Sequence, residues 1–194
     1  MADLLLELLS EEIPARMQVG AAEDLRRLVA DKLAEEGLSF DDARSYATPR
    51  RLVLVVEGLP ASQPDMHEER RGPRIDAPEK AINGFLRSVA LTRDEVSEVE
   101  GKKGTFLVAL IERKGRLTGD VIADIVPAVI QSFPWPKSMR WGRGHLRWVR
   151  PLKRLLCLLD GDVVNIEVEG LVATGATVGH RQMAPRAITV SSFK

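Results

Sequence analysis

The sequence predicts a mixed α/β fold in which mostly antiparallel or mixed sheets pack against helices. Two observations carry this prediction: short apolar runs typical of strands occur near both ends of the chain, and amphipathic segments with helical spacing lie between them. The 194 residues, 44% of them hydrophobic, suffice for one large domain or two small ones. A rigid Pro134-Trp135-Pro136 segment suggests two lobes. We expect an α/β lobe over 1–133 and the start of a β-rich lobe over 134–194, truncated at its C-terminal end.

The first elements are a strand and a helix. Residues 4–9 form a continuous apolar run that predicts a buried strand. Pro14 suits the beginning of a helix, and apolar residues between positions 17 and 33 mostly recur at i, i+4, i+8 and i+11. We therefore expect an amphipathic helix that ends at Gly37.

The middle of the chain alternates between strand and helix patterns. Residues 51–59 are rich in Val and Leu and predict a strand, and a polar loop is expected to follow as far as Pro73. Residues 79–89 carry one apolar face of a helix, and Thr92 with Glu95 matches a capping box. Residues 96–113 predict a β-hairpin.

The last third predicts one more helix and several short strands. Thr118 is expected to cap a helix whose Pro127 implies a kink, or a break after Val126. Residues 155–168 predict a second hairpin because Asp160-Gly161 suits a type I′ turn. Further strands are expected at 172–178 and 187–190.

Few residues are candidates for catalysis or metal binding. The three histidines lie far apart in the sequence, and no pair of ligands has metal-site spacing, so we expect no metal site. Cys157 stands between leucines and is typical of a buried core thiol rather than a nucleophile. No phosphate-binding glycine loop occurs. We expect neither catalytic residues nor a bound cofactor in this segment.

The composition also bears on where the protein works. No apolar run approaches the roughly 20 residues of a membrane span, and the N-terminus lacks the basic flank of a signal peptide. One cysteine excludes an internal disulfide. We expect a cytoplasmic protein without a membrane partner.

Charge is unevenly distributed although the net charge is zero. Residues 1–43 hold eleven acidic and four basic residues, whereas 125–159 hold no acid and seven basic residues. All three tryptophans lie among these cations. The resulting candidates for RNA contact are Lys137, Arg140, Trp141, Arg143, Arg147 and Arg150. The alternative is that tryptophan and proline are core residues with arginines stacked on them, and the pattern favours neither interpretation.

Two further cations, Arg50 and Arg51, follow Pro49 at the entry to the strand predicted at 51–59. Because successive strand residues point to opposite faces, one arginine can meet a ligand while the other is solvated. Both are candidates for RNA contact. The alternative is that they protect a strand edge from pairing with another chain.

An ordered series of short motifs runs through the chain. They are Leu4-Leu5-Leu6-Glu7, Ser10-Glu11-Glu12-Ile13-Pro14, Ala47-Thr48-Pro49-Arg50-Arg51-Leu52, Arg71-Gly72-Pro73, Lys80-Ala81, Gly84-Phe85, Pro136-Lys137-Ser138-Met139-Arg140-Trp141-Gly142, Arg150-Pro151 and Gly179-His180-Arg181. This series resembles the N-terminal part of the glycyl-tRNA synthetase β-subunit family. The chain departs from the family pattern in a shorter segment before Lys80, and in Gln182-Met183, where an aromatic residue is expected.

The resemblance implies a role in an α2β2 enzyme that attaches glycine to tRNA(Gly). It implies that ATP and magnesium act through the catalytic α subunit, a class II ligase, while the β subunit supplies tRNA recognition and assembly. The partners expected are therefore the α subunit and tRNA(Gly). Two alternatives remain open: a purely structural scaffold for the α subunit, and a stand-alone RNA-binding protein.

Overall fold

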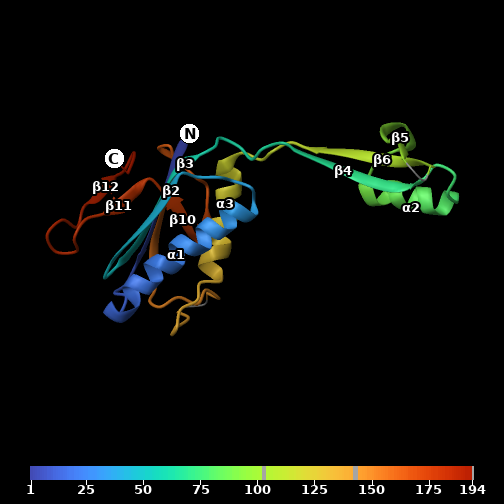
Figure 1. Ribbon diagram of the computed structural model, residues 1–194. Coiled ribbons are helices and arrows are strands. Elements are labelled where there is room, and N and C mark those ends of the chain that lie inside the picture. Colours follow the sequence, from blue (N-terminus) through green and yellow to red (C-terminus); the bar gives the residue numbers. More distant parts are fainter. Residues whose placement is uncertain (102–103, 142–143, 194) are drawn as a thin grey trace. The chain divides into compact units, whose positions relative to one another are not determined.

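The computed structural model describes residues 1–101, 104–141 and 144–193 (Figure 1). Its contacts divide the chain into two compact units. Residues 1–63 and 116–194 form one of them, here called the main unit, and residues 64–115 form the small unit. This division differs from the lobe boundary expected between residues 133 and 134.

The main unit is built on a mixed sheet that confirms the predicted fold class. In the described residues its seven strands run in the order β2-β3-β1-β7-β10-β9, with β8 paired to β7. The strands are β1 (Ala2–Ser10), β2 (Asp42–Thr48), β3 (Arg51–Leu59), β7 (Leu152–Leu159), β8 (Asp162–Val163), β9 (Glu167–Val168) and β10 (Leu171–Thr174). Strand β1 pairs antiparallel with both β3 and β7, and β10 runs parallel to β7. Because β7 pairs with β1, residues from both sides of position 133 share one sheet.

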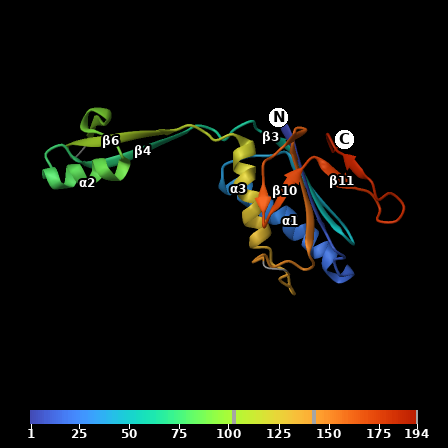
Figure 2. The ribbon, with the colours of Figure 1, turned by 180° about the vertical axis from the view of Figure 1, so that it is seen from behind.

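Two helices cover one face of this sheet, α1 (Ala15–Glu35) and α3 (Thr118–Gln131). Figures 1 and 2 show them side by side. Their buried residues join Leu4, Leu6 and Leu8 of β1 in one hydrophobic cluster, as the alternation of strand side chains requires. Helix α1 ends as predicted. Gly37 has φ +72°, and the N–H of Leu38 donates to the carbonyl of Leu33 at 2.8 Å, which is a Schellman cap.

Helix α3 differs from the sequence prediction at two positions. It continues through Pro127, so the break expected after Val126 does not occur. Thr118 does not cap the helix. It is the first helical residue and fully buried, and its hydroxyl donates to the carbonyl of Pro60 at 2.5 Å. The hydroxyl is therefore used to anchor α3 to the end of β3.

The Asp160-Gly161 turn forms as predicted, with φ values of +51° and +91° at its two residues. The hairpin it closes is shorter than expected, because only Asp162 and Val163 pair with β7. Beyond it, β11 (Ala176–Val178) and β12 (Ala187–Thr189) form a separate antiparallel hairpin. A Cβ at Gly175, which precedes β11, would lie 3.6 Å from the Leu158 side chain.

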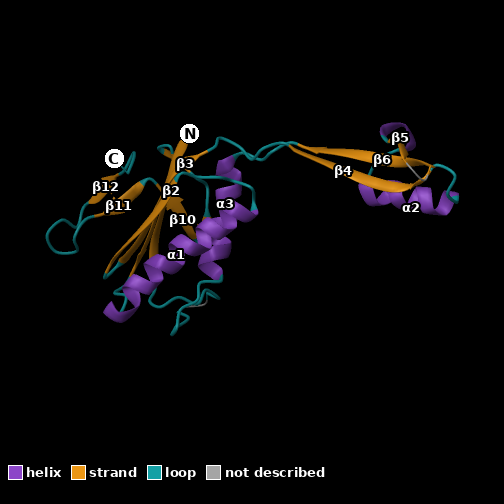
Figure 3. Cartoon of the chain, in the orientation of Figure 1, coloured by secondary structure: helices purple, strands orange, loops and turns teal. Residues whose placement is uncertain are grey.

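In its described residues the small unit has a three-stranded sheet, one α-helix and a short 3₁₀ helix (Figure 3). Its elements are β4 (Met66–Arg74), α2 (Glu79–Val89), the 3₁₀ turn η1 (Arg93–Glu95), β5 (Ser97–Gly101) and β6 (Gly104–Arg113). The predicted hairpin is confirmed, since β5 pairs antiparallel with β6. The capping box is also confirmed, since the Glu95 carboxylate accepts from the Thr92 N–H at 2.7 Å.

The prediction of a polar loop before Pro73 is wrong, because most of this segment forms strand β4. Its charged sequence suits an edge strand, and Pro73 falls at an irregularity in the pairing with β6 between Arg71 and Arg74. Gly72 lies against α2. A Cβ there would stand 2.5 Å from the Phe85 ring, so only glycine lets the helix approach the strand this closely.

We expect the Cys157 thiol to make stability depend on pH in alkaline solution. The side chain is fully buried, as predicted, and burial raises the pKa of the thiol from its ordinary 9.0 to about 12. Between these values the folded state keeps a proton that the unfolded state has lost. The contribution of the buried thiol to stability is therefore complete below pH 9. Between pH 9 and about pH 12 the free energy of unfolding falls by roughly 1.4 kcal/mol per pH unit.

The measurement is urea unfolding from pH 8 to pH 11 for the wild type and Cys157→Ala. The alanine variant starts from a lower stability but loses less of it as pH rises. Parallel curves for the two proteins would contradict the expectation. So would alkylation of the native thiol as fast as that of the denatured thiol.

Candidate functional site

The tryptophans of the acid-free segment serve mainly as core residues. Trp148 is 1% exposed, and its ring centroid lies 4.9 Å from those of both Phe133 and Trp135. Rings at this separation and tilt attract one another beyond simple burial of area. Trp141 is half-buried and packs against the same core. The core interpretation is therefore correct for Trp135 and Trp148.

The described cations that flank these aromatic residues lie on the surface. Met139 and Trp148 exchange two backbone hydrogen bonds, 2.8 and 3.2 Å long, which close a loop between them. We call residues 137–150 the basic loop. Its cations Lys137, Arg140, Arg147 and Arg150 are all exposed. In the described part of the chain none of the four has a carboxylate partner, and Arg143 lies outside the described residues.

A second group of predicted residues lies at the turn between β2 and β3. Thr48 pairs with Arg51, so Pro49 and Arg50 form the two-residue turn of this hairpin. The last residue of β1 and the segment after it are bound to the turn through their backbone. The Ser10 N–H donates to the carbonyl of Arg50 at 2.8 Å, and the Ile13 N–H donates to the carbonyl of Pro49 at 2.6 Å.

The two adjacent arginines have different surroundings. Arg51 is 22% exposed, and its Nε lies 3.2 Å from the carboxylate of Glu7, which is 13% exposed. Arg51 also donates to the carbonyl of Val178 in β11, and Thr177 donates to Glu7. Arg51 therefore ties the sheet to the β11–β12 hairpin.

Arg50 is bound less tightly. Its Nε donates to the carbonyl of Ser10 at 3.3 Å, and its Nη2 lies 3.8 Å from the carboxylate of Glu11. That second distance is longer than a hydrogen bond. The same carboxylate lies 3.6 Å from Nζ of Lys153, so Glu11 is shared between two cations.

The Gly179-His180-Arg181 motif forms the loop that leaves β11. Gly179 cannot be replaced without movement, because a Cβ there would lie 2.3 Å from the carbonyl oxygen of Ala184. The Ala184 N–H donates to the carbonyl of His180 at 2.8 Å. The backbone N–H groups of Gln182 and Met183 point to Nδ1 of His180 at 3.4 and 3.3 Å. Nδ1 is thus placed to accept from this backbone.

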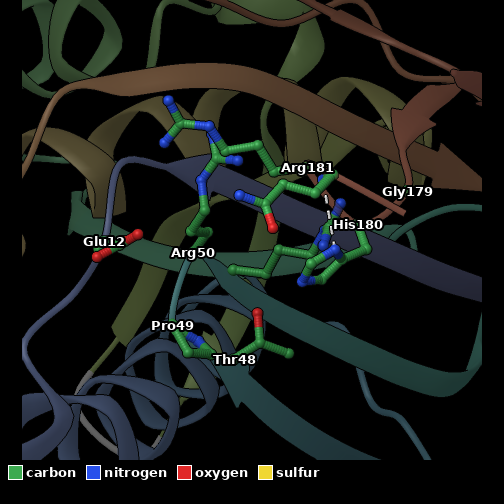
Figure 4. Close-up of a pocket in the computed structure, with 9 residues that line it drawn as sticks. Glu12, Thr48, Pro49, Arg50, Gly179, His180 and Arg181 are labelled. Atoms are coloured by element: carbon green, nitrogen blue, oxygen red, sulfur yellow. Dashed lines mark hydrogen bonds between the residues drawn. The ribbon is translucent and has the colours of Figure 1, made fainter. Parts of the chain in front are cut away.

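These two regions, far apart in sequence, enclose a pocket of about 810 Å³ in the main unit (Figure 4). Its lining residues are Glu12, Thr48, Pro49, Arg50, Arg51, Gly179, His180, Arg181 and Gln182. In Figure 4 the side chains of Arg50 and Arg181 extend toward the same end of the pocket, away from Thr48 and Pro49. Arg181 is exposed and has no ion-pair partner among the described residues. The pocket therefore offers guanidinium donors at one end and a carboxylate, Glu12, on its wall.

The structure brings together only part of the predicted set. Arg50 and Arg51 line the pocket, whereas no described residue of the basic loop does. The sequence prediction did not include Glu12, His180 and Arg181 among the contact residues, although each belongs to a motif of the ordered series. Among the described residues, no three of His, Cys, Asp and Glu are arranged to hold a metal ion. None of the described helices is both long and apolar enough to cross a membrane.

Comparisons with known proteins cover the whole chain. The family model described as glycyl-tRNA synthetase beta subunit matches residues 4–194. The chain is 54% identical to the glycine–tRNA ligase beta subunit of Cereibacter sphaeroides over 100% of its own length and 28% of that protein. It is 52% identical to that of Paracoccus denitrificans, over 100% of its length and 29% of the relative. With that of Phenylobacterium zucineum it shares 53% identity over 95% of the chain and 27% of the relative. The chain thus spans less than a third of these relatives.

We expect Arg51 to be a structural residue of this site. Replacing it with methionine keeps the aliphatic stem but leaves the Glu7 carboxylate without its cation, and it frees the carbonyl of Val178. The free energy of unfolding should fall by roughly 1–3 kcal/mol, the cost of leaving a mostly buried polar group unsatisfied. Urea unfolding measures the change.

The matched control is Arg154→Met. Arg154 lies opposite Leu9 in the β1–β7 pairing, is exposed and has no carboxylate partner in the described part of the chain. Its replacement should change stability by less than about 0.5 kcal/mol. Equal losses in the two variants would show that the Arg51–Glu7 pair has no special role.

Proposed function

Because this chain belongs to the glycyl-tRNA synthetase β-subunit family, we propose that it is the N-terminal part of a glycine–tRNA ligase β chain. In this proposal it contributes tRNA binding and subunit assembly, not the active site. The ligation of glycine to tRNA(Gly), with ATP and magnesium, takes place on a class II α subunit within an α2β2 assembly. The protein works in the cytoplasm, and this segment binds no cofactor.

The observation that supports tRNA binding is the basic loop. Trp148 inside the loop and Trp135 just before it are buried in the core, and the four described cations of the loop are exposed without carboxylate partners in the described residues. Exposed cations that are not neutralised locally attract phosphate over about a Debye length, roughly 8–10 Å. Arginine also pairs phosphate oxygens in a bidentate manner. Because buried aromatic residues hold this loop in place, the loop loses little conformational entropy when its cations bind a ligand.

We expect the double variant Lys137→Ala/Arg140→Ala to bind tRNA(Gly) more weakly and with a smaller salt dependence. Each phosphate contact contributes about 0.7–0.9 to the slope of log affinity against log salt, so the slope should fall by up to about two units. Stability should change by less than about 1 kcal/mol, because exposed charges contribute little to it. Filter binding at several salt concentrations and thermal unfolding measure the two quantities.

A matched control removes two exposed cations outside the basic loop, Arg26 and Arg87. This control keeps the same net charge as the test variant and should leave the slope close to that of the wild type. An unchanged slope in the test variant, together with early melting, would mean that these cations have a structural role. If the test variant instead loses α-subunit binding while its tRNA slope stays normal, the segment is a scaffold for the α subunit.

We further expect residues 1–194 alone to be inactive. Incubated with ATP, magnesium and glycine, they should exchange no pyrophosphate into ATP above a blank. Addition of the purified α subunit is the positive control for the reaction mixture. Glycine-dependent exchange by residues 1–194 without the α subunit would place activation chemistry on this chain and overturn the division of roles.

A further inference from the structure

The pocket lined by the β2–β3 turn and the loop after β11 has free donors at one end. Arg181 has no ion-pair partner in the described part of the chain. Arg50 uses Nε for the Ser10 carbonyl, while its Nη2 is 3.8 Å from Glu11, too far for a hydrogen bond. The guanidinium of Arg50 therefore keeps donors for a ligand. Two guanidinium groups that extend to the same end of a pocket suit a phosphate, whose oxygens accept paired N–H donors (Figure 4).

Arg51 has a different role although it also lines the pocket. Its Nε faces Glu7 and a terminal nitrogen donates to the Val178 carbonyl, one residue before Gly179. This contact fixes the start of the loop that carries His180 and Arg181. Arg51 is thus a positioning residue, and its charge is balanced by Glu7.

The other groups of the pocket match the rest of a nucleotide. Glu12 is an exposed carboxylate in the lining and can accept hydrogen bonds from sugar hydroxyls. The exposed ring of His180 offers a face on which a base can stack. The volume of about 810 Å³ lies within the usual range for small-molecule sites and far exceeds that of a phosphate ion.

We propose that this pocket binds one unpaired ribonucleotide of an RNA strand. Its phosphate is held by Arg50 and Arg181, its ribose hydroxyls donate to Glu12, and its base lies against His180. The choice of an RNA strand rather than a free nucleotide rests on the proposed function. The pocket is separate from the basic loop, because no described residue of that loop lines it.

The test is a fluorescence titration of the intact subunit with a labelled single-stranded oligoribonucleotide of five residues. Arg181→Ala should weaken binding about tenfold, which corresponds to one charge-assisted contact. It should also reduce the salt slope by about 0.7. The matched control is Arg186→Ala, which removes an exposed cation from the same hairpin but outside the pocket lining, and it should stay within twofold of the wild type. Equal weakening by both variants, or no effect of Arg181→Ala, overturns the proposal.

A second arm examines the sugar. The wild type should bind the oligoribonucleotide several-fold more tightly than the oligodeoxyribonucleotide of the same sequence, because only RNA carries the 2′-hydroxyl. Glu12→Ala should bring the two affinities within twofold of each other, and Glu12→Gln, which keeps an acceptor oxygen, should preserve part of the difference. If Glu12→Ala still prefers RNA to DNA as strongly as the wild type does, Glu12 does not bind the ribose and its assigned role is overturned.

A third arm separates the sources of the ligand and the two proposals. If Arg181→Ala weakens the binding of AMP but not the binding of the oligoribonucleotide, the ligand is a free nucleotide and the RNA assignment is overturned. The Lys137→Ala/Arg140→Ala variant should bind the oligoribonucleotide as the wild type does. If that variant loses tRNA salt dependence while Arg181→Ala changes nothing, the pocket proposal fails and the basic loop stands. If Arg181→Ala weakens oligoribonucleotide binding while Lys137→Ala/Arg140→Ala leaves the tRNA salt dependence unchanged, the pocket proposal stands and the basic-loop proposal fails.

Discussion

The structure of the main unit depends on the burial of strand β1 on both faces. One face carries Leu4, Leu6 and Leu8 into the cluster with α1 and α3. Glu7 lies on the opposite face, between Leu6 and Leu8 in sequence, and a carboxylate that is 13% exposed there is costly unless it is paired. Arg51 supplies the charge and Thr177 supplies a hydroxyl donor. The requirement to satisfy Glu7 therefore connects β3, β1 and β11.

This connection shapes the pocket. Among the described strands, β11 and β12 pair with each other and not with the main sheet, and side-chain contacts from Arg51 and Glu7 link this hairpin to the sheet. The bond from Arg51 to Val178 does so at the residue before Gly179. At Gly179 the carbonyl of Ala184 leaves no room for a Cβ, and the loop turns there. Arg51 contacts both Glu7 and the carbonyl of Val178, so the loop that carries Arg181 begins beside the β2–β3 turn. The Arg51–Glu7 ion pair thus helps to set the geometry of the pocket.

The sequence predicted those features that depend on local chemistry. The Schellman cap at Gly37, the capping box at Thr92 and the Asp160-Gly161 turn are each determined by a few neighbouring residues. The sequence does not predict strands β2 and β4, because edge strands with charged or alternating polar residues lack the apolar pattern that marks a buried strand. Thr118 has the residue type of a helix cap, but its hydroxyl bonds to Pro60, a contact between residues distant in sequence.

The core interpretation of the acid-free segment is correct for Trp135 and Trp148, while RNA contact by its exposed cations stays a prediction. Phe133, Trp135 and Trp148 bury large rings, which stabilises the base of the loop. The sequence alone could not assign each tryptophan to core or surface, because the loop has neither helical nor strand periodicity. Local sequence patterns could not predict the pocket either, because the two segments that line it lie some 130 positions apart and meet only in the folded chain.

The fold changes how the unevenly distributed charges of the sequence lie on the surface. Two acids of the N-terminal segment lie beside cations from other parts of the chain. Glu7 pairs with Arg51, and Glu11 lies near both Arg50 and Lys153. The cations closest to β1 are thereby neutralised in whole or in part. Those of the basic loop lie beyond the reach of these acids and, among the described residues, keep their charge unbalanced. A chain of zero net charge can therefore present a cationic surface to a polyanion, because the fold places its acids against one set of arginines and leaves another set exposed.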